Sequence, residues 1–336
     1  MNYDLVGIGN ALVDIEVQVS DDLVRKLEIT KGGMTLSTKE NQDEILEQVS
    51  NHTQKIVSGG SAANTIHGYS ALGGKGYYLG RVADDTFGKH YTDDMKDCGV
   101  GFPGPDTKTE GTGTCLILIT PDSERTMLTH LGISSELHPE NVDETIIRES
   151  KTVYIEGYLW TGDDTRAAAM KMADAARQVG VPVAFTLSDA FVVNTYKESL
   201  VDFIRWKVDI LFSNNVEARA MTGEEKDESA FAELKGMVDT LFMTRGAEGS
   251  WAANPQHAKI HIDPFQVSAV DTTGAGDLFA AGSLYGLIHN HDLKEAAIIG
   301  SYCAAQVVTH MGPRMPVNAH TDARKILNEY AQIASA

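Results

Sequence analysis

Short apolar segments alternate with segments of helical periodicity along most of this 336-residue chain. Residues 5–8, 152–156, 182–186, 209–212 and 240–244 are apolar runs typical of buried strands, and helical sequence follows most of them. This alternation predicts an α/β fold in which a mostly parallel sheet carries helices on both faces. In such folds, ligands bind beyond the carboxyl ends of the strands, so we expect the functional residues there.

Two segments, 15–37 and 107–131, interrupt this alternation. They carry strand patterns with little helical periodicity, and residues 13–19 alternate as a strand with one solvated face does. We therefore expect paired antiparallel strands in a small β-sheet that covers a cleft as a lid, with ordinary edge strands as the alternative. The α/β body would then comprise residues 1–14, 38–106 and 132–336.

Composition excludes several other functions. The formal net charge of −19 disfavours binding to nucleic acid or to an anionic membrane. No basic stretch followed by an apolar run opens the sequence, and no apolar segment approaches the roughly 20 residues that cross a bilayer. Three widely spaced cysteines without a CxxC pair are typical of reduced thiols, so we expect a cytoplasmic protein. No histidine spacing indicates a zinc site.

The segment 271–277 reads DTTGAGD and precedes a helical pattern that runs to residue 288. A helix that begins near Gly274 would direct its unpaired backbone N–H groups at an anion, and the small residues would let a phosphoryl group approach them. Asp277, in the first turn, could accept a proton from a substrate hydroxyl. A helix cap beside a tight turn is the alternative, but two aspartates around this turn make the chemical interpretation more specific.

This segment resembles the carboxy-terminal signature of the PfkB, or ribokinase-like, carbohydrate and nucleoside kinases. Residues 58–64, SGGSAAN, resemble their amino-terminal signature, and the resemblance extends across nearly the whole chain. It implies a ribokinase-like three-layer sandwich with a mostly parallel central sheet and a small β-sheet lid. It also implies that ATP and Mg²⁺ take part in the reaction. By the same resemblance, Asp277 is the catalytic base and Gly274, Ala275 and Gly276 form the anion hole.

The resemblance also assigns residues to the nucleotide. Asn214 and Glu217 match the N-x-x-E pattern that organises the magnesium–phosphate end, where Mg²⁺ usually keeps several waters and Glu217 would act through one of them. The ATP-binding turn would contain Thr244, Gly246 and Gly249. Asp271 and Thr273 correspond to a loop that binds a monovalent cation such as K⁺ in some relatives.

For the acceptor, residues 9–14, GNALVD, resemble the adenosine-kinase branch of the family. There Asn10 and Asp14 would hold ribose hydroxyls, because a buried carboxylate needs such partners. The floor under the sugar would consist of Gly59, Gly60 and Asn64.

The predicted lid supplies further candidates. Arg125 would lie over the phosphates and offset the acidic charge of the protein locally. Apolar walls for a flat base would come from Cys115, Met127, Leu131 and Met34, with Tyr158 stacking on the base. Apolar residues at strand spacing are also common in cores, so an ordinary core is the competing interpretation of these positions.

We therefore expect an ATP-dependent kinase that acts on a primary hydroxyl, with adenosine or a related purine nucleoside ahead of a sugar such as ribose or fructose. A non-catalytic nucleotide or sugar sensor is a remote alternative. Gly7 and Gly9 suggest a dinucleotide-binding turn, but Leu12 replaces the third glycine and no Walker A lysine motif is present. The sequence leaves open whether the chain is a monomer or a homodimer.

Overall fold

The larger of two sheets forms the centre of the computed structural model, which describes residues 3–106, 110–122, 124–315 and 322–333. Within these residues its strand order is β13-β12-β11-β10-β9-β8-β1-β5. The bounds are β1 Leu5–Ile8, β5 Gly76–Leu79, β8 Thr152–Glu156, β9 Val183–Thr186, β10 Ile210–Asn214, β11 Thr240–Thr244, β12 Ser250–Ala253 and β13 Ile260–Ile262. The six strands from β11 to β5 are parallel, and β12 and β13 are antiparallel at one edge, which confirms the predicted mostly parallel sheet.

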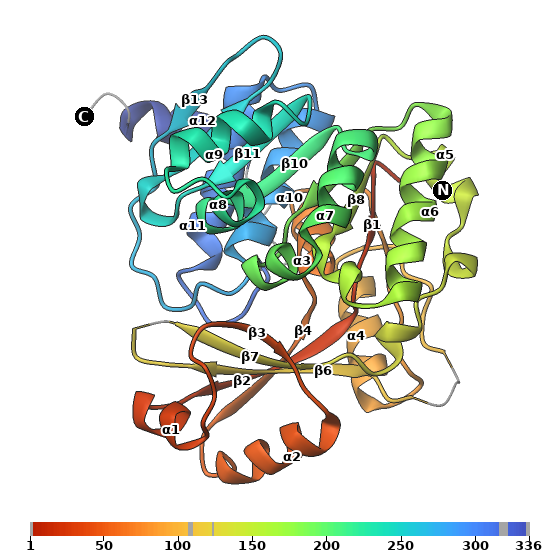
Figure 1. Cartoon of the computed structure of the whole chain (residues 1–336), viewed down its shortest axis with the longest axis vertical. Helices are drawn as coiled ribbons and strands as arrows, with labels where there is room; N and C mark the ends of the chain where they lie inside the picture. The colour runs from red at the N-terminus through yellow and green to blue at the C-terminus, as the bar shows by residue number, and fades with distance from the viewer. Residues whose placement is uncertain (1–2, 107–109, 123, 316–321, 334–336) are drawn as a thin grey trace.

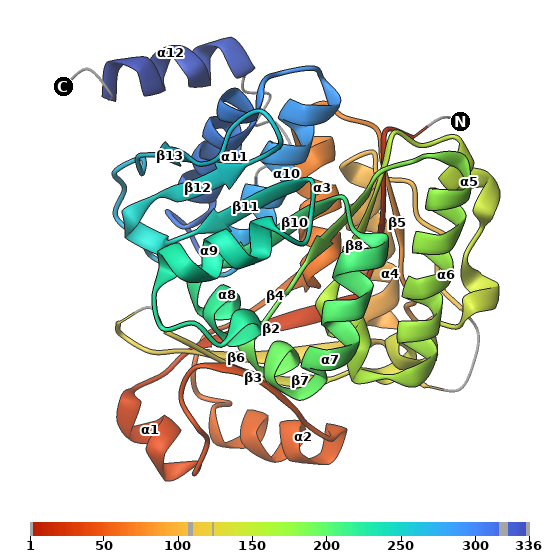
Figure 2. The same cartoon turned by 45° about the horizontal axis from the view of Figure 1, so that its top comes forward.

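Helices cover both faces of this sheet, as Figures 1 and 2 show. One face packs against α3 Ser61–Ala71, α4 Thr86–Asp97, α10 Ala275–Ile288, α11 Leu293–Val307 and α12 Ala323–Ile333. The other packs against α5 Glu144–Arg148, α6 Asp163–Val179, α7 Ala190–Lys207, α8 Asn215–Thr222 and α9 Asp227–Lys235. Alternate residues of the central strands, such as β1 and β8, enter the two cores, and for this reason these strands are apolar throughout instead of alternating. The predicted three-layer sandwich is confirmed.

Local sequence signals place several element ends. Strands β8 and β11 coincide with the predicted 152–156 and 240–244. Helix α6 ends where Gly180 adopts the left-handed conformation, with φ of 74°, that a side chain would disfavour.

The second sheet has the order β3-β7-β6-β2-β4 and lies beside the carboxyl ends of the central strands (Figure 1). Its strands are β2 Leu12–Gln18, β3 Gly33–Leu36, β4 Gln54–Gly59, β6 Gly113–Ile119 and β7 Arg125–His130. Helices α1 Asp21–Lys26 and α2 Lys39–Gln48 pack on its outer face through the side chains of Ile15, Val17, Val24, Ile45 and Val49, among others. We call this sheet with its two helices the lid.

The lid differs from the expectation in three respects. Strand β4 and helix α2 belong to it although they follow the predicted boundary at residue 37, and α1 lies inside the segment 15–37. Of its strand pairs, β2 with β6 and β3 with β7 are parallel, so the prediction of antiparallel pairs was wrong for these two. Sequence periodicity does not report which strands become neighbours. Residues 107–109 and 123 of the predicted lid lie outside the described residues.

The alternation of β2 predicted a solvated polar face. In the structure this face is buried. Asp14 is 5% exposed and Glu16 is 1% exposed. Their neighbours Ile15 and Val17 pack under the lid helices, so Asp14 and Glu16 point toward the α/β body. The alternating pattern was read correctly as a strand, but its polar side meets the rest of the protein instead of water.

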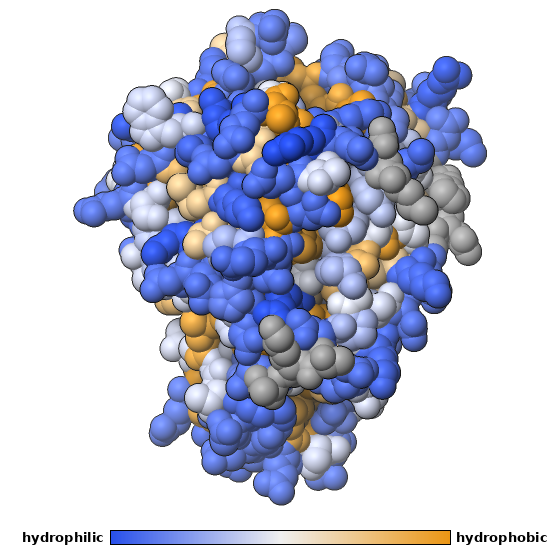
Figure 3. Space-filling view, turned by 90° about the vertical axis from the view of Figure 1, so that its right-hand side faces the viewer, coloured by the Kyte–Doolittle hydropathy of each residue, from blue (hydrophilic) through white to orange (hydrophobic). Residues whose placement is uncertain are grey.

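The surface is predominantly hydrophilic on the face that Figure 3 shows, in keeping with the high net negative charge. The cysteines Cys98, Cys115 and Cys303 are all buried and unpaired. Among the described helices, none combines the length and the apolar character that crossing a membrane requires.

Candidate active site

A cavity of about 470 Å³ separates the lid from the carboxyl ends of the central strands. The body contributes residues of six segments: Asn10, Gly60, Ser61, Asn64, Glu156, Tyr158, Thr161, Ser188, Asp189, Ala190, Asn214, Val216, Glu217 and the run from Thr272 to Asp277. The lid contributes Leu12, Asp14, Gly33, Met34, Leu36, Cys115, Ile117, Glu124, Arg125, Met127, Thr129 and Leu131. Most of the residues singled out from the sequence thus face one space.

The amino end of α10 opens into this cavity. Gly274, the N-cap, has φ of 77°, and a Cβ atom there would lie 2.5 Å from the carbonyl oxygen of Pro313. Only glycine fits this position without strain. At Gly276 a Cβ would meet nothing within 4 Å, so this residue leaves open space above the first turn. The backbone N–H of Ala275 donates to the Thr272 carbonyl at a long distance of 3.3 Å, and the N–H groups at the start of a helix lack intrahelical partners, so this turn can bind an anion.

Asp277 lies in the same turn, and two side chains from α3 hold its carboxylate. Ser61 Oγ donates to Oδ1 at 2.7 Å, and Asn64 Nδ2 donates to Oδ2 at 2.9 Å. Burial raises the pKa of Asp277 to about 6, although both donors and the charge of Arg125 oppose the shift. A carboxylate with this pKa is largely ionised at pH 7 and can accept a proton from an alcohol.

Asp14 and Asn10 also line the cavity. Burial raises the pKa of Asp14 well above its usual value, with the nearby charge of Glu16 adding to the shift. A Cβ atom on Gly59 would lie 2.1 Å from the Asp14 carboxylate, so this glycine makes room for the acid. The Oδ1 atom of Asn10 is buried without a hydrogen-bond partner among the described residues. A ligand hydroxyl would satisfy that oxygen.

Glu156 supports the part of the cavity around Asn10, and no role was predicted for it. Its Oε1 accepts from the backbone N–H of Asn10 at 2.8 Å, and its Oε2 accepts from the N–H of Ala62 at 2.7 Å. Burial raises the pKa of Glu156 to about 8, against the effect of these two donors. The side chain joins the end of β1 to the start of α3, and thereby fixes the position of Asn10 relative to the residues that hold Asp277.

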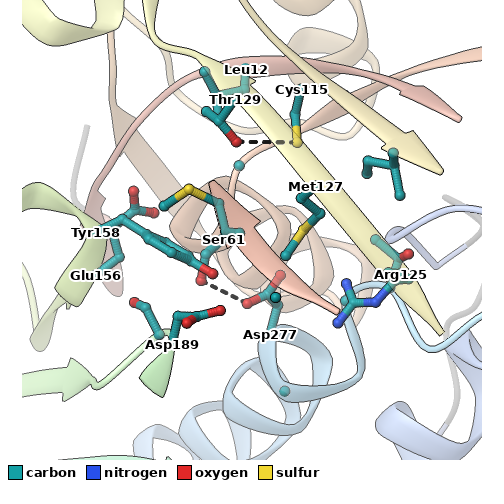
Figure 4. Close-up of a pocket in the computed structure, with 18 of the residues that line it drawn as sticks. Leu12, Ser61, Cys115, Arg125, Met127, Thr129, Glu156, Tyr158, Asp189 and Asp277 are labelled. Atoms are coloured by element: carbon teal, nitrogen blue, oxygen red, sulfur yellow. Dashed lines mark hydrogen bonds between the residues drawn. The ribbon is translucent and has the colours of Figure 1, made fainter. Parts of the chain in front are cut away.

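The lid side of the cavity is largely apolar (Figure 4). Leu12, Cys115 and Ile117 form one buried cluster, against which Met127 and Leu131 pack. The hydroxyl of Thr129 is satisfied by Cys115 Sγ at 3.4 Å, so it does not add a free donor to this wall.

Arg125 approaches Asp277 from the lid, as the close-up shows, and its charge lowers the pKa of both Asp277 and Asp189. Tyr158 lies on the opposite side of the cavity near Asp189, the N-cap of α7, and lowers the pKa of that carboxyl. Burial raises the pKa of both Tyr158 and Asp189. Neither Asp189 nor Ser61 was predicted to have a role of its own. Ser61 is one helical turn before Asn64, and that spacing was the available signal.

Asn214 and Glu217 form a capping box at the start of α8. Glu217 accepts from the Asn214 backbone N–H at 2.9 Å and from Asn214 Nδ2 at 2.7 Å. Burial raises the pKa of Glu217 to about 7, and the carboxylates of Asp189 and Asp277 add to the shift. Because both of its oxygens already accept hydrogen bonds, this side chain suits contact with magnesium through water better than direct ligation.

The other residues predicted to bind ATP, which are Thr244, Gly246 and Gly249, lie outside the cavity lining. Thr244 pairs with Asn214 in the sheet, at the neighbouring strand end. Gly249, with φ of 83°, could not carry a Cβ, which would lie 2.1 Å from the carbonyl oxygen of Ile262, whereas Gly246 borders open space. The structure therefore places this turn next to the Asn214–Glu217 end of the cavity but not within it.

The proposed cation loop is fully buried at Asp271. Its Oδ1 accepts from the N–H and hydroxyl of Thr273, at 2.8 and 2.6 Å, and its Oδ2 accepts from the N–H of Gly312 at 2.9 Å. Glu16 of the lid lies close by, and both of its carboxylate oxygens are buried without a hydrogen-bond partner among the described residues. Burial and the charge of Asp271 raise the pKa of Glu16 to about 7.

Residues 32–320 match the pfkB family of carbohydrate kinases. The chain belongs to this family. Its members transfer a phosphoryl group to an alcohol, generally with ATP and Mg²⁺. The match confirms both the resemblance found in the sequence and the kinase class inferred from it.

Individual relatives agree with this assignment. The chain is 26% identical to an adenosine kinase of Saccharomyces cerevisiae over 94% of its own length and 98% of the relative's. The crystal structure of adenosine kinase from Sinorhizobium meliloti superposes with a TM-score of 0.92 at 36% identity, and covers 97% of this chain and 99% of that one. A probable sugar kinase from Rhizobium etli superposes with a TM-score of 0.88 at 34% identity, over 100% and 99% of the two chains.

Proposed function

We propose that this pfkB kinase phosphorylates the primary hydroxyl of adenosine or a related purine nucleoside, giving AMP in the case of adenosine. The observation that carries the proposal is the division of the acceptor cavity into a polar end and an apolar wall. Asp14 and Asn10 mark the polar end, whereas Cys115, Met127 and Leu131 belong to the apolar side. A nucleoside has the same division, with hydroxyls on the ribose and a flat, weakly hydrated base.

The chemistry follows from the arrangement around α10. The acceptor hydroxyl would lie between Asp277 and the γ-phosphorus of ATP. Its oxygen forms the new P–O bond while the bond from that phosphorus to the β,γ-bridging oxygen breaks, and ADP leaves. Asp277 takes the hydroxyl proton as the oxygen attacks. The N–H groups at Gly274, Ala275 and Gly276, together with Arg125, bind the oxygens of the transferring group.

Magnesium would neutralise the nucleotide phosphates when it is bound, and Asn214 and Glu217 are the residues that fit its water shell. A monovalent cation at Asp271 and Thr273 is a separate proposal. The orphaned carboxylate of Glu16 supports it, because a buried charge of this kind needs compensation. The Lys55 ammonium group donates to the carbonyl of Met311, next to the Gly312 that contacts Asp271, and supplies part of that compensation without an added ion.

The test is a coupled assay of ADP release with ATP, Mg²⁺ and a panel of nucleosides and sugars, applied to the wild type and to Asp277→Asn. The asparagine can still accept from Ser61 but cannot take a proton. We expect kcat with adenosine to fall by about 10²-fold or more, in line with the loss of a general base. Thermal shifts with ATP and adenosine should remain, since the fold and binding surfaces are kept. A variant that keeps most of its kcat would refute the assignment of the base.

A sugar acceptor is the second candidate, and the similarity to a probable sugar kinase of Rhizobium etli favours it. Met127→Ser separates the two. For a nucleoside, the polar serine should raise KM through the lost contact with the base. A free sugar has no base against this wall, so its KM should change little. Turnover of ribose or fructose without turnover of any nucleoside would reverse the ranking.

We further infer that one chain completes its own site. The inner face of the lid meets the cavity, and α1 and α2 cover its outer face within the same chain. A second subunit is therefore not needed to bury the described lid sheet. Sedimentation of the active enzyme tests this: a monomer that turns over at full rate agrees with it, and activity confined to a dimer contradicts it.

A further inference from the structure

A buried arginine lies behind the residues that hold Asp277. Arg314 follows α11, and its side chain is 10% exposed. Its guanidinium lies 5.5 Å from the ring centroid of Tyr91 and forms an ion pair with Asp94, both on α4. The Nε atom donates to Asn64 Oδ1 at 3.3 Å. Arg314 does not line the cavity, and it contacts Asp277 only through Asn64.

The hydrogen-bonding capacity of the three side chains fixes the orientation of the amide between them. A guanidinium has only donors, and an ionised carboxylate has only acceptors. Asn64 can satisfy both neighbours in one way, with Oδ1 toward Arg314 and Nδ2 toward Asp277. In the flipped amide, Asn64 Nδ2 would face the Nε–H of Arg314, and Oδ1 would face the carboxylate of Asp277. Both contacts would be repulsive. Among the described residues, the Arg314 Nε–H is the hydrogen-bond donor to Asn64 Oδ1, so its loss would remove the contact on that side that favours the orientation serving Asp277.

We propose that Arg314 is a positioning residue for the phosphoryl transfer, because its Nε–H holds the Asn64 amide in the orientation that donates to Asp277. The inference rests on the proposed function, in which Asp277 is the base. The orientation of the Asn64 amide also affects the protonation of Asp277. Asn64 is the first of the donors that keep the pKa of Asp277 from rising further, so an amide that is flipped for part of the time would leave more of the base protonated at a given pH.

Other groups also act on Asp277 and must stay constant in a test. Those that interact with its charge are Arg125 and Asp14 from the lid, Tyr154 and Glu156 from β8, Tyr158 after β8, and Glu217 from α8. Arg314 is not among the charges that act directly on Asp277. Its charge does lower the pKa of Asp14, but the two variants described next both lose that charge, so the difference between them depends on the hydrogen bond to Asn64.

Two substitutions isolate that hydrogen bond. In Arg314→Gln, the amide nitrogen occupies the position of the arginine Nε, so the donor is kept and the charge is lost. In Arg314→Met, a methyl group occupies the same position, so donor and charge are both lost. Each is made together with Asp94→Asn, so that neither variant leaves an unpaired carboxylate beside the former guanidinium.

The measurement is kcat against pH for the acceptor that the wild type uses. The acid limb is the range in which kcat falls as the pH is lowered. For the methionine variant we expect the midpoint of this limb to rise by about one pH unit, the size of one lost hydrogen bond to a charged group. The glutamine variant should stay within about 0.3 unit of Asp94→Asn alone. Equal profiles for the two variants, or a methionine variant with an unshifted limb, would overturn the proposal. Arg81→Met removes another buried arginine, paired with Asp106 outside the cavity, and should leave the limb in place.

A second readout does not require turnover. The ¹³C carboxyl resonance of Asp277, assigned by comparison with Asp277→Asn, gives its titration midpoint in the ligand-free protein. The same upward shift for methionine and not for glutamine supports the proposal; no difference between them overturns it. If the wild type phosphorylates no acceptor in the panel, the proposed function fails, and this titration still decides the role of Arg314 in orienting Asn64.

Discussion

Ser61→Ala should make the rate of this kinase depend more steeply on acidity. The Ser61 hydroxyl donates to Asp277 Oδ1 at 2.7 Å, and the carboxylate has a pKa of about 6. A hydrogen bond to a charged group contributes about 1.5–3 kcal/mol, so its loss should raise that pKa by about one unit or more. The sign follows from the chemistry: the donor stabilises the ionised form, and its removal favours the protonated, inactive form.

The magnitude can be worked out for two pH values. If the pKa moves from about 6 to about 7, the ionised fraction at pH 6 falls about fivefold, whereas at pH 8 it falls less than about 1.2-fold. The kcat of Ser61→Ala relative to wild type should follow these ratios, measured at saturating ATP and acceptor in buffers of equal ionic strength. Equal losses at both pH values would refute the reasoning, because they would mean that Ser61 acts on something other than protonation.

Thr65→Val is the matched control. Thr65 lies on the same helix and is buried, but its hydroxyl contacts the backbone carbonyl of Asp277 at 3.2 Å and not the carboxylate. Valine keeps the shape and removes the hydroxyl. It should leave the acid limb of the pH profile unchanged, even if stability falls slightly. A shift as large as that of Ser61→Ala would show that loss of packing, and not loss of the donor, moves the pKa.

Two further predictions concern Gly60, in the predicted floor under the acceptor, and Glu217, in the proposed magnesium site. Gly60→Ala should lower the free energy of unfolding by about 1–3 kcal/mol or more, because Gly60 has φ of 92° and a Cβ would lie 2.2 Å from the Asn10 carbonyl oxygen. Gly99→Ala, at φ of 74° with nothing within 4 Å, is the control for urea denaturation, and an equal loss there would argue against the clash. Glu217→Gln should raise the Mg²⁺ concentration for half-maximal rate by about tenfold or more, since residues that orient a metal's waters typically contribute that much. An unchanged magnesium curve would contradict the role of Glu217.

Sequence alone determined the local features of this protein. The apolar runs placed β8 and β11 at their observed bounds, and the glycine turn placed the start of α10 with Asp277 in its first turn. These predictions succeed because strand burial, helix periodicity and glycine conformation depend on residues that are near one another in the chain. The two family signatures then gave the kinase class.

The tertiary structure decided which distant residues meet. Ser61 and Asn64 reach Asp277 from more than 200 positions away, and Arg314 reaches Asn64 across 250. Strand β4 joins the lid, and the polar side of β2 turns toward the body and not toward water. Periodicity fixes which face of an element is polar but not what that face will meet, because strand order and helix packing are set by long-range contacts that carry no local pattern.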